Sequence, residues 1–80
     1  MSDFKYEILR EIGVISEGDK GWTKELNIVS FNDDPGKIDI RNWCKGSKMM
    51  GKGITLNKEE FLILKGLINE IDEDDLSILD

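Results

Sequence analysis

The sequence is poor in the residues that most often carry catalysis or bind metals, since it has no histidine and a single cysteine, Cys44. One cysteine cannot form a disulfide within one chain, and without histidine the usual Cys/His ligand sets of a zinc site are missing. No serine stands in a nucleophile-elbow motif, and residues 45–53 do not fit a phosphate-binding GxxxxGK[ST] loop. We therefore expect no enzyme, and no catalytic residue, metal, cofactor or small-molecule substrate. Cys44 is expected to be an inert or half-buried thiol.

Long hydrophobic runs are also missing. No apolar stretch approaches the roughly 18 residues of a membrane-spanning helix, and the N-terminus has no signal-peptide pattern. We therefore expect a cytoplasmic protein, compatible with association with the nucleoid, and no membrane partner. Residues 1–80 are expected to form a single domain, which at this size buries only about 60% of the surface of its unfolded chain. With disulfides and metals excluded as supports, oligomerisation is the remaining one, and it predicts a homodimer.

The net charge of −6 hides an uneven distribution along the chain. Residues 1–19 hold two basic and five acidic side chains, a balance of −3. Residues 20–58 hold eight basic and four acidic ones, a balance of +4, whereas residues 59–80 hold one and eight, a balance of −7. The local field decides whether a polyanion can approach one face of a protein. The total charge therefore does not exclude a nucleic acid as partner.

Two stretches in the first half have the pattern of β-strands. Residues 4–16 mix apolar and charged side chains in a way that also fits a short helix, but Gly13 and the β-branched Val14 and Ile15 favour a strand. Residues 22–32 are rich in aromatic and β-branched side chains and lie between two turn signals, the second of which holds the only proline. Both parities of this second stretch carry apolar residues, which suits a bulged strand or one covered on both sides.

Residues 37–44 and 53–56 are expected to complete a curved antiparallel sheet of about four strands. In the third strand Ile38 and Ile40 share one face, which is expected to lie in the core. Residues 45–53 form a glycine- and lysine-rich connection between the two strands. The face of the third strand opposite the two isoleucines carries three residues in a row: Lys37, Arg41 and Trp43.

Residues 58–71 have the pattern of an amphipathic helix, which makes the expected fold class α+β. Asn57 is a favoured N-cap residue, and Glu60 can complete a capping box with it. Residues 72–80 are expected to form a frayed acidic tail. The apolar stripe of the helix is wider than one side of a small sheet needs, so part of it is expected to face a second subunit. The stripe consists of Phe61, Leu64, Ile68 and Ile71.

Basic and aromatic side chains are interleaved along the expected strands and their connections. Cations can follow the phosphates of a single-stranded nucleic acid while flat rings stack on its exposed bases. Core packing explains the tryptophans about equally well, and an ordinary solvated strand edge explains the lysines, so the pattern by itself is weak. The residues of the pattern are Lys20, Trp22, Lys24, Lys37, Arg41, Trp43, Lys48 and Lys52.

Three segments carry a resemblance to a known family. KIDIRNW (37–43) and MGKGITLNKEEFLILKGLINEID (50–72) resemble the core pattern of the transcriptional coactivator family known as positive cofactor four. In that pattern an IDIR strand and a basic KGI[ST]L strand lead directly into a C-terminal helix. The segment KGWTKELNIVSFND (20–33) resembles the small bacterial branch of the family, and the likeness covers about residues 21–72.

The resemblance implies a curved antiparallel sheet, dimerisation through the helices, and sequence-tolerant binding of single-stranded DNA across the strands. It implies that Arg41 contacts phosphates or stacks on bases, that Lys52 contacts the nucleic-acid backbone, and that Trp43 offers a stacking ring. Three further residues match the bacterial segment and would line the neighbouring strand: Trp22, Lys24 and Phe31.

The chain also departs from the family pattern. Eukaryotic members have a second aromatic residue where this chain has Cys44, and their serine-rich basic N-terminal region has no counterpart here. A coactivator role is therefore not carried over. The leading hypothesis is a homodimeric, largely sequence-independent single-stranded DNA-binding protein that assists transcription, replication or repair. Two alternatives stay open: RNA binding by the same surface, and a protein-interaction adaptor that uses the helix stripe and the acidic tail.

Overall fold

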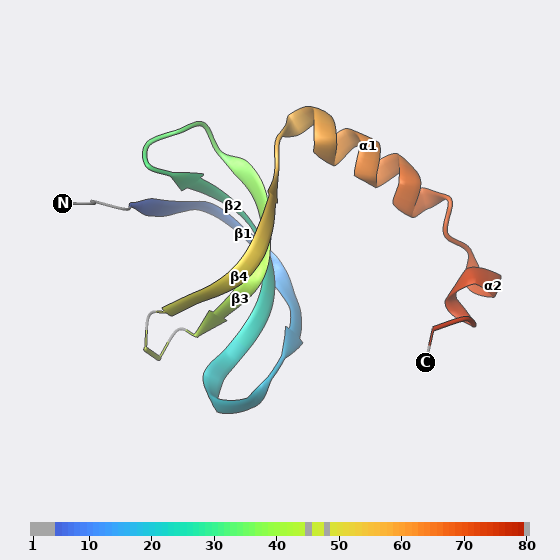
Figure 1. Ribbon diagram of the computed structural model, residues 1–80, viewed down its shortest axis with the longest axis horizontal. Coiled ribbons are helices and arrows are strands. Elements are labelled where there is room, and N and C mark those ends of the chain that lie inside the picture. Colours follow the sequence, from blue (N-terminus) through green and yellow to red (C-terminus); the bar gives the residue numbers. More distant parts are fainter. Residues whose placement is uncertain (1–4, 45, 48, 80) are drawn as a thin grey trace.

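The computed structural model describes residues 5–44, 46–47 and 49–79, and it shows a curved sheet followed by helices (Figure 1). The four strands pair antiparallel in the order β1-β2-β3-β4. The expected α+β class is thereby confirmed. The elements are β1 (Tyr6–Glu17), β2 (Trp22–Phe31), β3 (Lys37–Cys44), β4 (Met49–Leu56), α1 (Lys58–Asn69) and α2 (Glu73–Leu76), with a short 3-10 turn at Asp19–Gly21.

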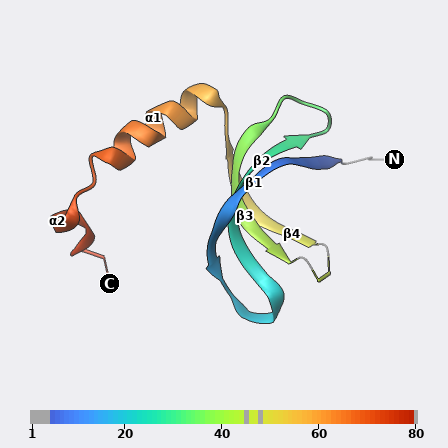
Figure 2. The same cartoon turned by 180° about the vertical axis from the view of Figure 1, so that it is seen from behind.

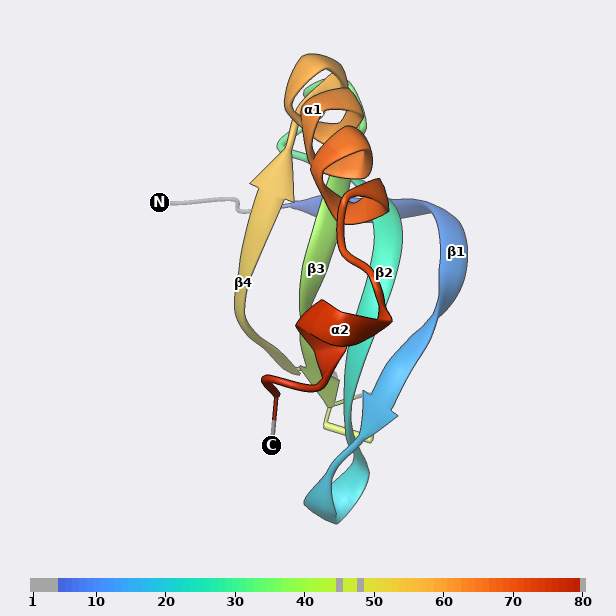
Figure 3. The ribbon, with the colours of Figure 1, turned by 90° about the vertical axis from the view of Figure 1, so that its right-hand side faces the viewer.

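The pairing of β2 with β3 forms the regular centre of the sheet. Eight residue pairs follow one another, from Trp22 opposite Cys44 to Val29 opposite Lys37, without a shift of register. The other two pairings are interrupted, because β1 shifts register three times against β2 and β4 shifts once against β3. Such bulges bend a strand and increase its twist. The outer strands therefore curl around the centre, as the side view in Figure 3 shows.

The start of α1 agrees with the sequence prediction. The Asn57 side chain accepts a hydrogen bond from the Glu60 backbone N–H at 2.8 Å, and the Glu60 carboxylate accepts one from the Asn57 N–H at 2.9 Å. This capping box fixes the first turn of the helix. From there α1 runs away from the sheet, so that α1 and α2 stand apart from the strands in Figures 1 and 2.

Several predicted boundaries differ from the structure. β4 begins at Met49 instead of residue 53, because its first half pairs with Trp43 and Cys44 although its glycine-rich sequence has a weak strand pattern. α1 ends at Asn69 instead of residue 71. The prediction of a frayed tail is wrong for α2, where Asp72 and Asp75 form a second capping box. Phe4, at the start of the first predicted strand, lies outside the described residues.

The burial pattern also corrects the sequence prediction. Ile38 and Ile40 were expected in the core, yet both are only half-buried, whereas Asp39 between them is 0% exposed. The more deeply buried face is the concave one, because the curved sheet closes over it. Among the described residues the buried hydrophobic side chains are Val29, Trp43 and Cys44, and the buried polar ones are Glu25, Asn27 and Asp39.

Gly53 offers a test of the β3–β4 pairing. A Cβ at this position would overlap the Arg41 Cβ and lie 2.5 Å from the Ile40 carbonyl oxygen, and the backbone there cannot yield as a flexible side chain would. We expect Gly53→Ala to lower the free energy of unfolding by about 3 kcal/mol, the upper part of the range for overpacking. Urea unfolding followed by circular dichroism measures the change.

Gly66 in α1 is the matched control, because a Cβ there meets nothing within 4 Å. Gly66→Ala is expected to raise the free energy of unfolding by about 0.5–1 kcal/mol through helix propensity alone. A Gly53→Ala protein as stable as the parent would contradict the observed approach of β4 to β3.

Candidate nucleic-acid interface

The concave face of the sheet collects alternate residues from the two central strands. Because successive side chains of a strand point to opposite faces, the register assigns one parity of β2 and β3 to the same side. Asn27 lies opposite Asp39, Glu25 opposite Arg41, and Thr23 opposite Trp43. The residues of β2 and β3 on this face are Thr23, Glu25, Asn27, Val29, Phe31, Lys37, Asp39, Arg41 and Trp43.

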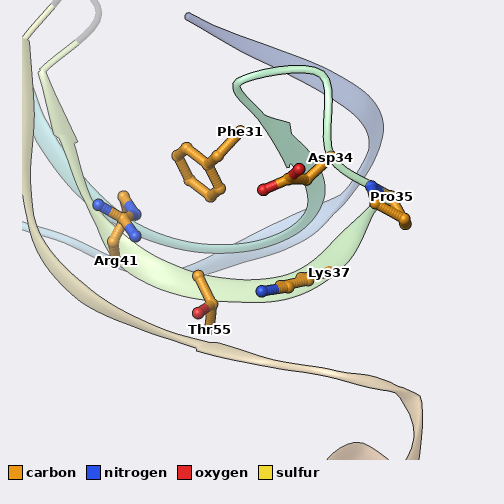
Figure 4. Close-up of a pocket in the computed structure, with 6 residues that line it drawn as sticks. All are labelled: Phe31, Asp34, Pro35, Lys37, Arg41 and Thr55. Atoms are coloured by element: carbon orange, nitrogen blue, oxygen red, sulfur yellow. The ribbon is translucent and has the colours of Figure 1, made fainter. Parts of the chain in front are cut away.

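A hollow of about 330 Å³ opens at one end of this face (Figure 4). The Phe31 ring stands in the middle of its lining, with the Arg41 guanidinium on one side and the Asp34 carboxylate on the other. Here an aromatic face, two cations and hydrogen-bonding oxygens surround one space. The lining residues are Phe31, Asp34, Pro35, Lys37, Arg41 and Thr55.

Arg41 is held in place by its own chain. Its Nε donates to both carboxylate oxygens of Asp39 at 2.8 Å, and its Nη2 lies 2.7 Å from Asp39 Oδ1. Its Nη1 donates to the Gly51 carbonyl at 3.3 Å. The guanidinium carbon lies 5.1 Å from the centre of the Phe31 ring, within the range of a cation–π contact. The Arg41 side chain is 13% exposed and that of Asp39 0%.

A second polar group lies beside this pair on β2. The buried Glu25 carboxylate accepts hydrogen bonds from the Thr23 hydroxyl at 2.6 Å and from the Asn27 amide nitrogen at 3.2 Å. Two buried polar atoms of the described residues, Asn27 Oδ1 and Trp43 Nε1, have no hydrogen-bond partner in the structure. The middle of the concave face is therefore buried and polar, and hydrogen bonds join many of its own side chains to one another.

Aromatic rings border a second hollow of about 260 Å³ on this face, lined in part by Tyr6 and Trp43. Their ring centres lie 5.4 Å apart at an angle of 49°. Trp43 is only 5% exposed, whereas Tyr6 is 41% exposed. The ring that meets solvent here is thus Tyr6, which the sequence pattern did not mark. Only the curl of β1, which its residue types do not reveal, brings Tyr6 to Trp43.

The other predicted contact residues are not gathered at the hollow. Trp22 and Lys24 belong to the opposite parity of β2, and the Trp22 ring lies near Gly51 of β4 on that side. Lys20 lies in the turn before β2 with a φ of 60°. Lys52 is exposed at the bulge of β4, and Lys48 lies outside the described residues. The structure therefore brings together Phe31, Lys37 and Arg41, with Trp43 buried on the same face.

Cys44 is a free, buried thiol at the end of β3, and its Sγ donates to the Lys20 carbonyl at 3.6 Å. Hydrogen bonds from Ser47, first from its side chain and then from its backbone, hold the pKa of Cys44 below its usual value, although desolvation opposes them. In the described part of the chain no three acidic or cysteine residues group as metal ligands would.

The predicted dimer stripe lies on α1 and just beyond its end. Phe61 and Leu64 are half-buried, and Phe61 lines a hollow together with Ile38 of β3, whereas Ile68 and Ile71 are 53% and 52% exposed. Other apolar residues of this region are equally open, including Ile63 and Leu67. None of the described helices has the length and hydropathy to span a membrane.

A sheet curved around a lined hollow and followed directly by a capped helix defines a small α+β domain with one open concave face. The family model for Transcriptional Coactivator p15 (PC4) matches residues 18–67. An uncharacterized protein of Treponema pallidum (strain Nichols) is 42% identical over 72 residues, which cover 90% of this chain and 85% of the relative. The chain belongs to the PC4 family, as its sequence resemblance predicted. Membership is consistent with binding of single-stranded DNA by a non-enzymatic domain.

The hydrogen bonds to Cys44 lead to a pH prediction. Ser47→Ala removes the side-chain hydrogen bond that contributes most to the lowered pKa, so we expect the thiol pKa to rise. The rate of alkylation by iodoacetamide as a function of pH measures it, and its midpoint should move to higher pH. Ser30→Ala, which removes a hydroxyl bonded to the Asp34 carbonyl, is the control and should leave the midpoint in place. An unmoved midpoint in Ser47→Ala would contradict the assignment.

Proposed function

We propose that the protein binds single-stranded DNA on its concave face, largely without regard to sequence, and acts as a homodimer. The observation that carries the proposal is the hollow where the Phe31 ring, the Lys37 ammonium and the Arg41 guanidinium meet. A stacking ring beside cations is what an extended single strand requires. Family membership supports the same conclusion. Such a protein would act in the cytoplasm, where the strands of a bacterial genome are exposed during transcription, replication or repair.

The rings are proposed to divide their tasks according to exposure. Phe31 lines the hollow and Tyr6 is 41% exposed, so both can meet a base without rearrangement. Trp43 is 5% exposed, so it would not meet a base itself but would pack against the Tyr6 ring and hold it in place. Trp22 and Lys24 lie on the opposite side of β2, so a strand seated in the hollow reaches them only by passing around the sheet edge.

The dimer proposal rests on apolar surface that the described chain leaves open. The convex face presents the half-buried Ile38 and Ile40 and the 56% exposed Ile54, while Ile68 and Ile71 on and beyond α1 are about as open. Monomeric proteins rarely leave large apolar patches uncovered. In a two-fold dimer both copies contribute the same surface patch, so the exposed apolar residues of one copy would meet those of the other. We propose that it covers the helix stripe and the convex face.

Substitution in the hollow tests the DNA proposal. Phe31→Ala is expected to weaken binding of a labelled oligo-dT by roughly 5- to 150-fold, which corresponds to roughly 1–3 kcal/mol for one stacked base. Fluorescence anisotropy at two salt concentrations measures this, and the affinity of the parent protein should fall at the higher one. Lys65→Gln on α1 removes a charge outside the hollow and serves as control. No binding of oligo-dT by the parent protein would refute the proposal. Stronger binding of oligo-rU than of oligo-dT would identify RNA as the preferred ligand of the same surface.

A charge on the helix stripe tests the dimer. Ile68→Asp is expected to change the mass in solution from twice the 9.1 kDa of the chain to one chain, because a buried unpaired carboxylate is costly. Size-exclusion chromatography with light scattering measures it. Gly66→Asp puts the same carboxylate on the opposite side of α1 and should leave the dimer intact. If the parent protein elutes as a monomer, the dimer proposal is refuted, and the exposed helix stripe would favour the adaptor function instead.

A further inference from the structure

Arg41 lines the candidate hollow, yet its hydrogen-bonding groups point toward its own chain. Nε and Nη2 form a two-pronged contact with Asp39, and Nη1 is engaged by the Gly51 carbonyl and lies 3.4 Å from Met50 Sδ. A guanidinium grips a phosphate with the same two-pronged geometry. Arg41 therefore cannot grip a phosphate with its Nε–Nη2 edge without releasing Asp39, and using its Nη1–Nη2 edge would cost a contact of Nη1 with Gly51 or Met50.

Releasing Asp39 is unfavourable because that carboxylate is fully buried. Its side chain is 0% exposed, so without Arg41 it would be a charge in a medium of low dielectric. The neighbouring group on β2, the carboxyl of Glu25, is 2% exposed and is not a cation, so it cannot take over the role of the guanidinium. The ion pair is therefore expected to persist when a ligand is bound.

An intact pair also changes the electrostatics of the hollow. The charges of Arg41 and Asp39 cancel within hydrogen-bonding distance, so Arg41 adds almost nothing to the field that attracts phosphates. Lys37, which lines the same hollow, is exposed and is free to supply that field. What Arg41 offers is its flat guanidinium beside the Phe31 ring, at 5.1 Å. Planar guanidinium groups stack on bases as well as on rings.

We propose that Asp39 is a positioning residue that holds Arg41 as a charge-compensated platform for a base, and that Lys37 makes the phosphate contact in this hollow. The inference rests on the proposed function, since it assigns parts to residues of the same site. It distinguishes between two roles, phosphate contact and base stacking, that the family resemblance leaves together for Arg41.

The dependence of affinity on salt separates the two roles. Each phosphate neutralised in a single strand contributes about −0.7 to the slope of log affinity against log salt concentration. Lys37→Gln should therefore make the slope shallower by about 0.7. The double variant Asp39→Asn/Arg41→Gln removes both charges together and leaves neither buried alone. It should keep the parent slope while affinity for oligo-dT falls roughly tenfold, the loss expected for one stacked base.

For the single variant Asp39→Asn the expected change in the salt slope is opposite to that of Lys37→Gln. It leaves the positive charge of Arg41 without its partner, so the slope should become steeper by about 0.7. A merely structural role for Asp39 would lower stability without steepening the slope. Circular dichroism identifies any variant that fails to fold.

A measurement on the parent protein keeps the proposal testable if the variants unfold. The Arg41 Nε–H signal in nitrogen-15 spectra should stay slowly exchanging when oligo-dT is bound, because its bond to Asp39 persists. Coupling between a guanidinium nitrogen and a phosphate phosphorus would overturn the proposal, as would a double variant whose slope becomes as shallow as that of Lys37→Gln. If the parent protein does not bind oligo-dT, the proposed function fails as well. If the parent protein binds oligo-dT with a steep salt dependence but the variants do not behave as predicted, the proposed function stands and only the roles of Asp39 and Arg41 are overturned.

Discussion

The regular ladder between β2 and β3 is the constraint on which the rest of the molecule depends. Its eight consecutive pairs set Glu25 opposite Arg41 and Asn27 opposite Asp39, all on the same face. A slip by one residue would turn every one of these side chains to the other side of the sheet. The outer strands shift register against this ladder and curl around it. The curl turns a flat polar face into a concave, buried one.

A polar concave face changes how the fold is stabilised. Buried polar groups cost free energy unless they are bonded, and here the Asp39–Arg41 pair and the Thr23–Glu25–Asn27 group supply most of those bonds. Apart from Val29, Phe31 and Trp43, many apolar residues lie on the convex side and on α1, where the described chain covers them only in part. The side that a small sheet usually buries thus remains available for a partner. Binding of a ligand and assembly of subunits would then use opposite faces and need not compete.

The sequence predicted those features that depend on local chemistry. Alternation along 37–44 placed Lys37, Arg41 and Trp43 on one face, and Asn57 with Glu60 fixed the start of α1. It failed where three-dimensional curvature decides. The burial of Trp43 depends on bulges whose positions a run such as 4–16 does not reveal, and the same curl brings Tyr6 into the site. The first half of β4 was missed because its glycines give a weak strand pattern. The helix α2 was missed because its run of acidic residues is typical of a solvated tail.

The separation of charge along the chain becomes a separation in space. The basic middle segment contributes β2, β3 and β4, whereas the acidic final segment forms α1 and α2, which leave the sheet (Figure 1). Exposed charges are largely screened from one another beyond about 8 Å at physiological salt, and the molecule measures 49 Å along its longest axis. The acids of α2, which stand apart from the strands in Figure 1, therefore need not cancel the field of the strands. Moving those acids onto the rim of the hollow, beside Lys37, would remove this independence, because attraction and repulsion would then act on the same phosphates.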